Sequence, residues 1–264
     1  MHPMLWQYGP FTLYTFGLCF AVAVLLGAWV VLRQAARERD FPLTQETLSD
    51  VLLAGVLGGI VGGRFLYIVL NWPVYVEQPW EVVALWRGGL VYYGGFVGGL
   101  AAVLWYVHRQ LVRAHRWSAA SCLQVIDACM PALALAQSVG RLGCFFNGCC
   151  YGRTTLSGWG MRFPGALLPL YPTQLLESFG ALMLFVILRA VQVRQERRPA
   201  PPPPGLLTGL YLVCYGVLRF SLEFLRGDNP HWWLGLTVSQ WIGVVVVPLG
   251  VGLLSWRRAR SVRA

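Results

Sequence analysis

Seven apolar segments dominate the chain, and each is close to the length required to cross a lipid bilayer. A helix rises about 1.5 Å per residue, so it crosses a hydrocarbon core about 30 Å thick in about 20 residues. Of the 264 residues, 56% are hydrophobic and only 12% are charged, which is too few charges to cover a soluble protein. We therefore predict an all-α, polytopic membrane protein with about seven transmembrane helices. The predicted helices are 11–32, 48–70, 89–107, 119–140, 173–189, 206–225 and 236–256.

The placement of arginine predicts how these helices are oriented. All 21 basic residues are arginine, and fourteen of them lie in alternate loops and in the C-terminal tail. The positive-inside rule places those loops in the cytoplasm, so the C-terminus is predicted to be cytoplasmic and the N-terminus to lie outside. The arginines do not form one basic face, which argues against nucleic acid as a partner. The first ten residues lack the basic region of a cleaved signal peptide.

The organisation predicted from these segments is one integral-membrane domain over residues 1–264. Residues 141–172 would form a small periplasmic head or arm, and residues 190–205 an Arg- and Pro-rich cytoplasmic loop. Glycines repeat at intervals of four in two neighbouring segments, a pattern typical of close helix packing in membranes. The repeats are Gly55, Gly59 and Gly63, Gly58 and Gly62, Gly94 and Gly98, and Gly95 and Gly99.

Three arginines fall within or at the edge of predicted spans, where charge is costly and usually functional. Arg64, Arg141 and Arg219 all belong to the outer half of the bilayer in the predicted orientation. Other polar residues share this level: Tyr14, Tyr93, Gln174, Glu177, Glu223 and Arg226. Two interpretations stay open. The arginines form structural ion pairs, for example Arg219 with Glu223. Alternatively, surplus positive charge binds a phospholipid phosphate through paired N–H donors.

The stretch VGRLGCFFNGCCYG, residues 139–152, adds three cysteines to one of these arginines. The spacing of Cys144, Cys149 and Cys150 does not match the C-x₂₋₄-C pairs or His partners of a structural zinc site, so no metal is predicted. A disulfide is a weak alternative, since the motif would face an oxidising compartment. Cysteine as a small apolar packing residue is the interpretation we prefer.

The remaining residues of the stretch suit an anion. Gly140 and Gly143 flank Arg141, so backbone amides could approach a ligand closely. Asn147 could hydrogen-bond a glycerol hydroxyl or a backbone group. The combination indicates recognition of an anion with a polyol at the membrane interface.

GRLGCFFNGCCYG resembles the signature of bacterial prolipoprotein diacylglyceryl transferases, Gly-Arg-x-Gly-Asn-Phe-x-Asn-x-Glu-x-x-Gly. The matching positions are Gly140, Arg141, Gly143, Phe145, Asn147 and Gly152. GGRFLYIVLNW, RGGLVYYGGFVGG, YPTQLLES, YGVLRFSLEFLRGD and LTVSQ also resemble family segments, in the family's order. Three positions depart from the common pattern: Cys144 replaces Asn, Cys149 replaces Glu, and Tyr93 stands where many members have His.

The resemblance implies an enzyme of lipoprotein biosynthesis. It would transfer the diacylglyceryl group of phosphatidylglycerol to the lipobox cysteine of a preprolipoprotein signal peptide, forming a thioether and releasing glycerol phosphate. No cofactor is implied. The protein would be a multi-pass component of the bacterial inner membrane, surrounded by membrane lipids, with its active site at the outer leaflet; a monomer is the default. The alternatives are a paralogue that binds phospholipid but has another acceptor or lacks this activity, and less plausibly a membrane transporter.

By matching positions, Arg141 would bind the phosphate and Arg219 would bind or activate it. Tyr14, Asn147, Gly152, Glu223 and Arg226 would shape the site, and the depth of Arg64 and Glu177 adds them to the substrate-binding residues. The thiol proton requires an acceptor, for which Tyr93, Glu223 or water are the candidates. Tyrosine, with a reference pKa of about 10, needs nearby arginines to become a base at neutral pH.

Overall fold

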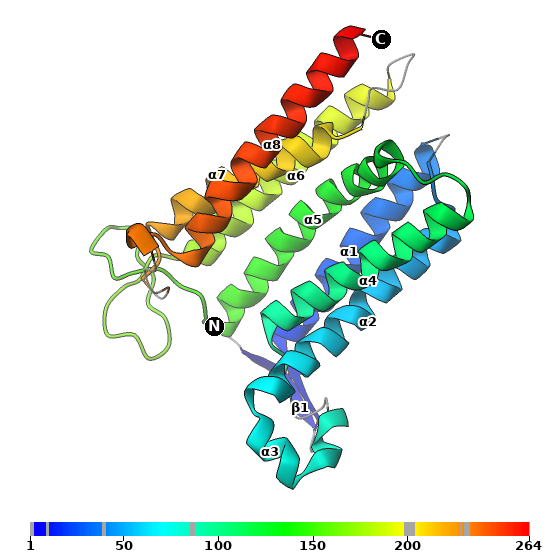
Figure 1. Cartoon of the computed structure of the whole chain (residues 1–264). Helices are drawn as coiled ribbons and strands as arrows, with labels where there is room; N and C mark the ends of the chain where they lie inside the picture. Colours follow the sequence, from blue (N-terminus) through cyan, green and yellow to red (C-terminus); the bar gives the residue numbers. More distant parts are fainter. Residues whose placement is uncertain are drawn as a thin grey trace. The chain divides into compact units, whose positions relative to one another are not determined.

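The computed structural model describes residues 3–8, 11–38, 41–84, 88–197, 204–227, 229 and 233–263. Long helices occupy all seven predicted positions, so the all-α prediction is confirmed (Figure 1). They are α1 (Thr15–Arg37), α2 (Gln45–Leu70), α4 (Tyr92–Arg113), α5 (Ala119–Asn147), α6 (Thr173–Glu196), α7 (Leu206–Glu223) and α8 (Val238–Arg263).

Among the described residues, six of these helices are long and apolar enough to cross a membrane, and α4 is the exception. Its sequence contains two tyrosines at the start and His108 and Arg109 in its second half, which lowers its hydropathy. Only 17% to 39% of the residues in the six apolar windows are buried. Apolar surface exposed to this extent requires a lipid environment. A membrane crossing by α4 and the orientation of the termini stay predictions.

Several helix ends differ from the predicted ones, and three of the differences change the interpretation of a segment. Residues 11–14 form a strand instead of the first turn of a helix, because β2 (Phe11–Tyr14) pairs antiparallel with β1 (Met4–Tyr8). Helix α5 continues seven residues past residue 140, which makes the start of the predicted 141–172 arm helical. Helix α6 extends to Glu196, so the beginning of the predicted 190–205 loop is also helical. Residues 198–203 of that loop lie outside the described residues.

The chain divides into two compact units, and the second comprises residues 35–122. Its helices α2 and α4 lie side by side (Figure 1) and touch through glycine, as the repeats predict. A Cβ added to Gly62 would lie 2.4 Å from the carbonyl oxygen of Gly94, and one added to Gly98 2.4 Å from that of Gly58. The connection from α2 to α4 contains two short helices that the sequence did not indicate, α3 (Trp72–Glu77) and η1 (Pro79–Val83).

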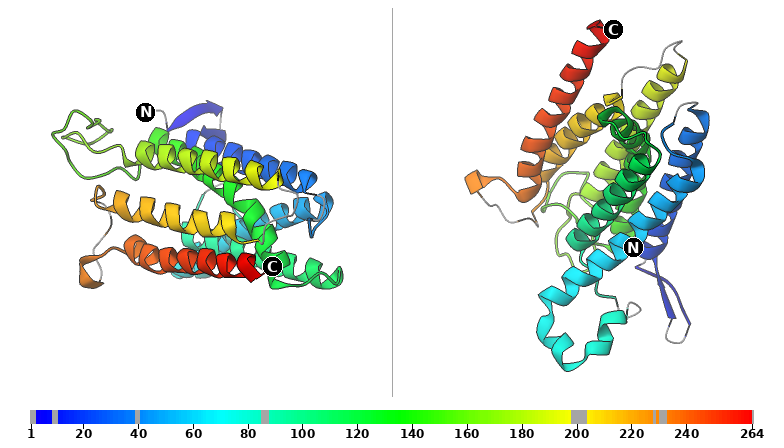
Figure 2. Two further views of the ribbon diagram at one scale, coloured as in Figure 1. Left: turned by 90° about the horizontal axis from the view of Figure 1, so that it is seen from above. Right: turned by 45° about the vertical axis from the view of Figure 1, so that its right-hand side comes forward.

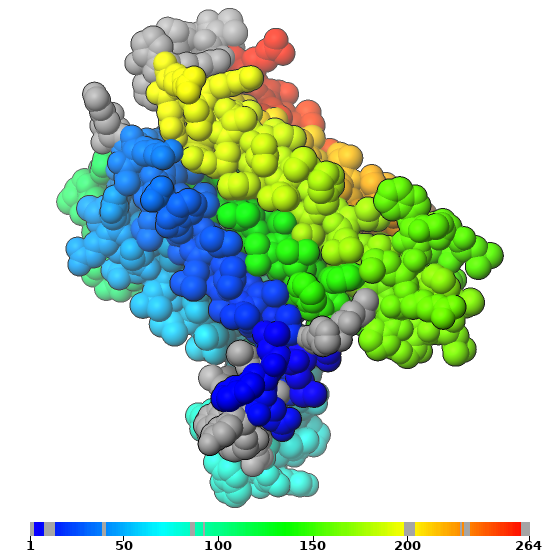
Figure 3. Space-filling view, turned by 180° about the vertical axis from the view of Figure 1, so that it is seen from behind, coloured from blue at the N-terminus to red at the C-terminus, as the bar shows by residue number. Residues whose placement is uncertain are grey.

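The first unit comprises residues 1–34 and 123–264. Helix α7 contacts both α6 and α8, and Figure 2 shows the three running alongside one another. Side chains of α5, α6 and α7 form its core: Met130, Ala134, Leu184, Leu188, Leu207 and Tyr211. The loop 148–172, light green in Figure 3, is held by isolated bridges and has exposed apolar side chains at its surface. The assignment of all 264 residues to one membrane domain stays a prediction.

Candidate active site

The cysteine-containing stretch forms the end of α5 and the turn that follows it. The amide of Cys149 donates to the carbonyl of Cys144 (3.1 Å), and that of Gly148 to the carbonyl of Phe145 (3.1 Å). Gly148 has φ +73°, so these two bonds form a Schellman motif with glycine in its left-handed position. The motif satisfies two terminal carbonyls of the helix and turns the chain back toward α5. Arg141 therefore lies within the last two turns of α5.

Arg141, Glu177 and Tyr215 connect three helices through one carboxylate. The Nη2 atom of Arg141, on α5, lies 3.0 Å from Oε1 of Glu177, on α6. The hydroxyl of Tyr215, on α7, donates to the same oxygen at 3.0 Å. The Glu177 side chain is 3% exposed and that of Arg141 25%. A carboxylate this buried needs its charged partner, so the guanidinium is anchored while part of its surface stays accessible.

Arg219 and Glu223 form a second pair, one turn apart on α7, with 2.5 Å between Nη1 and Oε2. Polar side chains that follow the helix in the sequence form further hydrogen bonds with this pair. Asn229 and Thr237 both donate to Oε1 of Glu223, at 2.6 and 2.7 Å, while Arg219 donates to the hydroxyl of Ser239 at 3.0 Å. The pairing of Arg219 with Glu223 that the sequence suggested is confirmed, and it fixes the guanidinium against the beginning of α8.

The expected surplus of unpaired arginine charge is wrong for Arg141 and Arg219, because each faces a buried glutamate. The ion pairs do not use all the hydrogen-bond donors of Arg141 or of Arg219. A guanidinium carries five N–H donors on three nitrogens. The described bonds use one nitrogen of Arg141 and two of Arg219. Hydrogen-bonding capacity for an anion therefore remains, although the local charge is balanced.

Gly152 and Arg226 lie opposite each other in an antiparallel bridge. The strand-like segment around Gly152 also pairs with the residues before α6. The amide of Gly152 donates to the carbonyl of Tyr171 (2.8 Å). A Cβ on Gly152 would lie 2.5 Å from the carbonyl oxygen of Leu225. Glycine is therefore required here by the close approach of backbone, and the pairing ties the loop after α5 to the end of α7.

Replacing Gly152 with alanine is expected to destabilise the protein by about 1–3 kcal/mol, the usual cost of overpacking. The added methyl group would collide with backbone, which cannot rotate away as a side chain would. Thermal unfolding of the purified protein in detergent would measure the loss. Gly158→Ala is the matched control, because nothing lies within 4 Å of its added Cβ in the same loop. Equal melting temperatures for the two variants would contradict the structural role of Gly152.

Two buried residues at the start of α6 hold the cysteine turn in place. Thr173 donates to the carbonyl of Cys150 (3.0 Å), and Gln174 to that of Cys149 (2.7 Å). The other amide atom of Gln174, Oε1, is buried without a hydrogen-bond partner among the described residues. A buried acceptor left unpaired is costly, so a hydroxyl-bearing ligand would find a partner there.

The electrostatics of the turn favour an anion at Cys149. Hydrogen bonding by the thiols of Cys144 and Cys150, and also by Asn147, lowers the pKa of the Cys149 thiol. The charge of Arg141 acts in the same direction, and burial opposes it. Asn147, the last residue of α5, is exposed.

Arg64 is buried in the second unit, where backbone carbonyls surround it. Its Nε donates to Val82 (2.9 Å) and its Nη1 to Gly88 (2.7 Å), while Nη2 donates to Glu81. The rings of Tyr67 and Tyr75 lie 5.7 and 5.6 Å from the guanidinium. Arg64 thus organises the connection between α2 and α4, and substrate binding by it stays a prediction.

The two candidate tyrosines are exposed. Tyr14 ends β2 and is 53% exposed, whereas Tyr93, near the start of α4, is 64% exposed. Tyr93 belongs to the second unit with Arg64, and its role as a base stays a prediction. The first unit contains the other candidates: Tyr14, Arg141, Asn147, Gly152, Glu177, Arg219, Glu223 and Arg226.

Sequence reasoning missed several partners of these residues. Tyr215 was not among the predicted site residues, although its hydroxyl donates a hydrogen bond to Glu177. Thr237 and Ser239 belong to LTVSQ, a segment that resembles the family but was given no role. Asn229 follows the RGD of the preceding segment, and its contact with Glu223 depends on a loop whose path the sequence does not specify.

Comparison with known proteins identifies the family. A family model described as prolipoprotein diacylglyceryl transferase matches residues 3–256. The chain belongs to this family. A phosphatidylglycerol–prolipoprotein diacylglyceryl transferase of Photobacterium profundum is 32% identical over 96% of the chain and 92% of its own length. Proteins of the same description from Aromatoleum aromaticum and Polaromonas are 34% and 31% identical, covering 97% and 100% of the chain and 95% and 96% of their own lengths. The family predicted from the sequence motifs is therefore confirmed.

Proposed function

We propose that this protein transfers the diacylglyceryl group of phosphatidylglycerol to the thiol of a lipobox cysteine in a preprolipoprotein. The full-length similarity to transferases of that description supports the reaction. The observation that carries the site assignment is the pair of anchored guanidiniums. Tyr215 of α7 hydrogen-bonds Glu177, the partner of Arg141, and Arg219 follows Tyr215 one turn later on the same helix, so a guanidinium from α5 and one from α7 are both held near Tyr215.

The reaction forms a carbon–sulfur bond and breaks the bond between the glyceryl carbon and the phosphate oxygen. The thiol loses its proton, and glycerol phosphate leaves with the bonding electrons. Remaining N–H donors of Arg141 would bind the phosphate and offset the charge that develops on it, with Arg219 assisting. Because Glu177 and Glu223 fix the two guanidiniums before substrate arrives, little reorganisation is required during the reaction.

The proton acceptor in this proposal is Tyr93 or water. Glu223 already accepts hydrogen bonds from Asn229, Thr237 and Arg219, and this set suits it to positioning Arg219. Oε1 of Gln174 is buried and has no hydrogen-bond partner among the described residues, and the proposal assigns it to a hydroxyl of the glycerol headgroup. The enzyme would act in the inner membrane with its site at the outer leaflet, and as a monomer.

The test is a reconstitution. The purified protein is placed in nanodiscs containing phosphatidylglycerol and incubated with a lipobox peptide, and mass spectrometry follows the peptide. We expect the mass of a diacylglyceryl group on the cysteine, and none on a Cys→Ser peptide or in nanodiscs of phosphatidylethanolamine alone. Binding of phosphatidylglycerol without product would favour the paralogue with another acceptor and overturn the proposal.

A further inference from the structure

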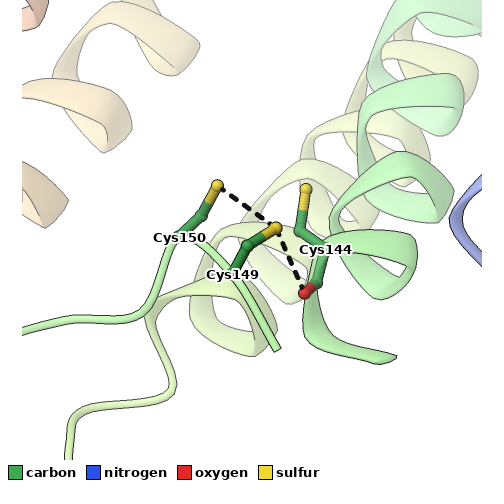
Figure 4. A group of neighbouring side chains, drawn as sticks. All are labelled: Cys144, Cys149 and Cys150. Atoms are coloured by element: carbon green, nitrogen blue, oxygen red, sulfur yellow. Dashed lines mark hydrogen bonds between the residues drawn. The ribbon is translucent and has the colours of Figure 1, made fainter. Parts of the chain in front are cut away.

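The thiols of Cys144, Cys149 and Cys150 converge at the end of α5. Their three sulfur atoms all lie within 4.8 Å of one another, and those of Cys149 and Cys150 are 3.7 Å apart. Figure 4 shows the three side chains gathered where the turn returns to the helix. A metal bound to three thiolates at about 2.3 Å holds its sulfurs about 4 Å from one another. The observed spacing is therefore close to that of a three-sulfur metal site.

The cluster arises from backbone features that the cysteine spacing alone does not reveal. In the Schellman motif the residue after the left-handed glycine returns to the helix three residues before its cap, and these positions are Cys149 and Cys144. Cys150 has φ +63°, a conformation that costs a non-glycine residue about 1–3 kcal/mol. Thr173 and Gln174 fix both cysteines through their carbonyls. Several backbone hydrogen bonds thus fix the turn in a conformation that brings the three thiols together.

We propose that Cys144, Cys149 and Cys150 bind a single soft metal ion, Cu⁺ or Zn²⁺. Sulfur is the only donor type in this cluster, which selects thiophilic ions over Mg²⁺ or Ca²⁺. The bound ion is held by three thiolates, whose remaining thiol protons are released to solvent, so the three sulfurs and the ion together carry −2 with Cu⁺ and −1 with Zn²⁺. The positive charge of Arg141 acts on all three cysteines and offsets this negative charge.

The burial of the three cysteines and the distances between their sulfur atoms distinguish a metal ion from a disulfide and from simple packing. Cys144 is buried, but Cys149 and Cys150 are only half-buried, so an entering ion would reach them from the turn. A disulfide would require two sulfurs at about 2.05 Å, and all seven cysteines are free thiols. Packing alone does not require three adjacent sulfurs to face one another. A metal ion accounts for both their number and their convergence.

The experiment measures binding to the full-length, reduced protein in detergent under anaerobic conditions. Cu⁺ and Zn²⁺ are each titrated in competition with a chromogenic chelator. We expect one ion per chain, and loss of that ion in Cys149→Ser. The control variant replaces the four remaining cysteines, Cys19, Cys122, Cys129 and Cys214, with serine and should bind as the wild type does. Because binding is the readout, the result is independent of transferase activity.

A second measurement uses the wild-type protein, so it does not depend on the folding of a variant. The protein is alkylated with and without metal, and peptide mass spectrometry assigns the modified cysteines. Metal should protect Cys144, Cys149 and Cys150 together. The proposal is overturned if neither ion binds stoichiometrically, if binding survives in Cys149→Ser, or if the three thiols are alkylated equally with and without metal. A disulfide among them in protein isolated without reductant would also overturn it.

Discussion

Arg141→Gln is expected to lower transfer of the diacylglyceryl group by at least about a hundredfold, the scale at which loss of one preorganised donor acts. The substitution removes a charged donor for the phosphate. It also leaves Glu177, 3% exposed, with the neutral Tyr215 as its remaining partner in the part of the chain that the structure describes. Breaking a buried pair in this way costs about 3–5 kcal/mol of folding stability. The same variant therefore loses activity for two reasons, which one measurement cannot separate.

The double variant Arg141→Gln, Glu177→Gln separates them. A neutral glutamine at residue 177 no longer carries a buried charge, so most of the lost stability should return. If Arg141 serves the reaction, transfer stays at the level of the single variant, whereas a purely structural arginine would let transfer return with stability. Thermal unfolding and product formation are measured on the same preparations. Recovery of both quantities in the double variant would refute the role of Arg141 in binding phosphate.

Gly98→Leu is expected to disrupt the contact between α2 and α4 and to destabilise the second unit by about 3 kcal/mol or more. The first added carbon alone would lie 2.4 Å from the carbonyl oxygen of Gly58 and 2.8 Å from Cα of Gly62. Both are backbone atoms of the neighbouring helix, so the helices must separate to admit a side chain. Limited proteolysis and thermal unfolding in detergent would detect the change.

Gly252→Leu is the matched control for this effect. Gly252 lies within α8, and nothing approaches within 4 Å of its added Cβ. Both substitutions add the same apolar side chain and remove the same flexible residue from a helix. Gly98→Leu should melt at a clearly lower temperature than Gly252→Leu. If the two variants melt together, close contact between backbones does not stabilise the pair.

The helices could be predicted from the sequence because long apolar segments form helices in a membrane, and six of the seven have the length and hydropathy of a span. Their ends could not, because polar residues at helix ends are compatible with several boundaries. Arg141 illustrates the consequence. Placed at a helix end, it appears free to bind an anion; placed within α5, it faces Glu177 of α6. The i, i+4 pair of Arg219 with Glu223 was predictable, since helical spacing brings such residues together.

Contacts with backbone explain most of what sequence reasoning missed. The partners of Arg64 are carbonyls within residues 81–84 and 88–89, and every residue type carries a carbonyl, so no sequence pattern marks them. A metal site at the three cysteines was not predicted, because their spacing in the sequence differs from that of zinc motifs, which are built on other turns. Asn-Gly at positions 147 and 148 was the available signal, since glycine in that position ends helices in a Schellman motif.

The glycine seam between α2 and α4 limits how the protein can move during turnover. Backbone pressed against backbone has no spare volume and no rotamers to exchange, so the two helices cannot slide past each other in small steps. If the proposed lipid substrate enters from the side, the movement that admits it has to occur outside this pair of helices.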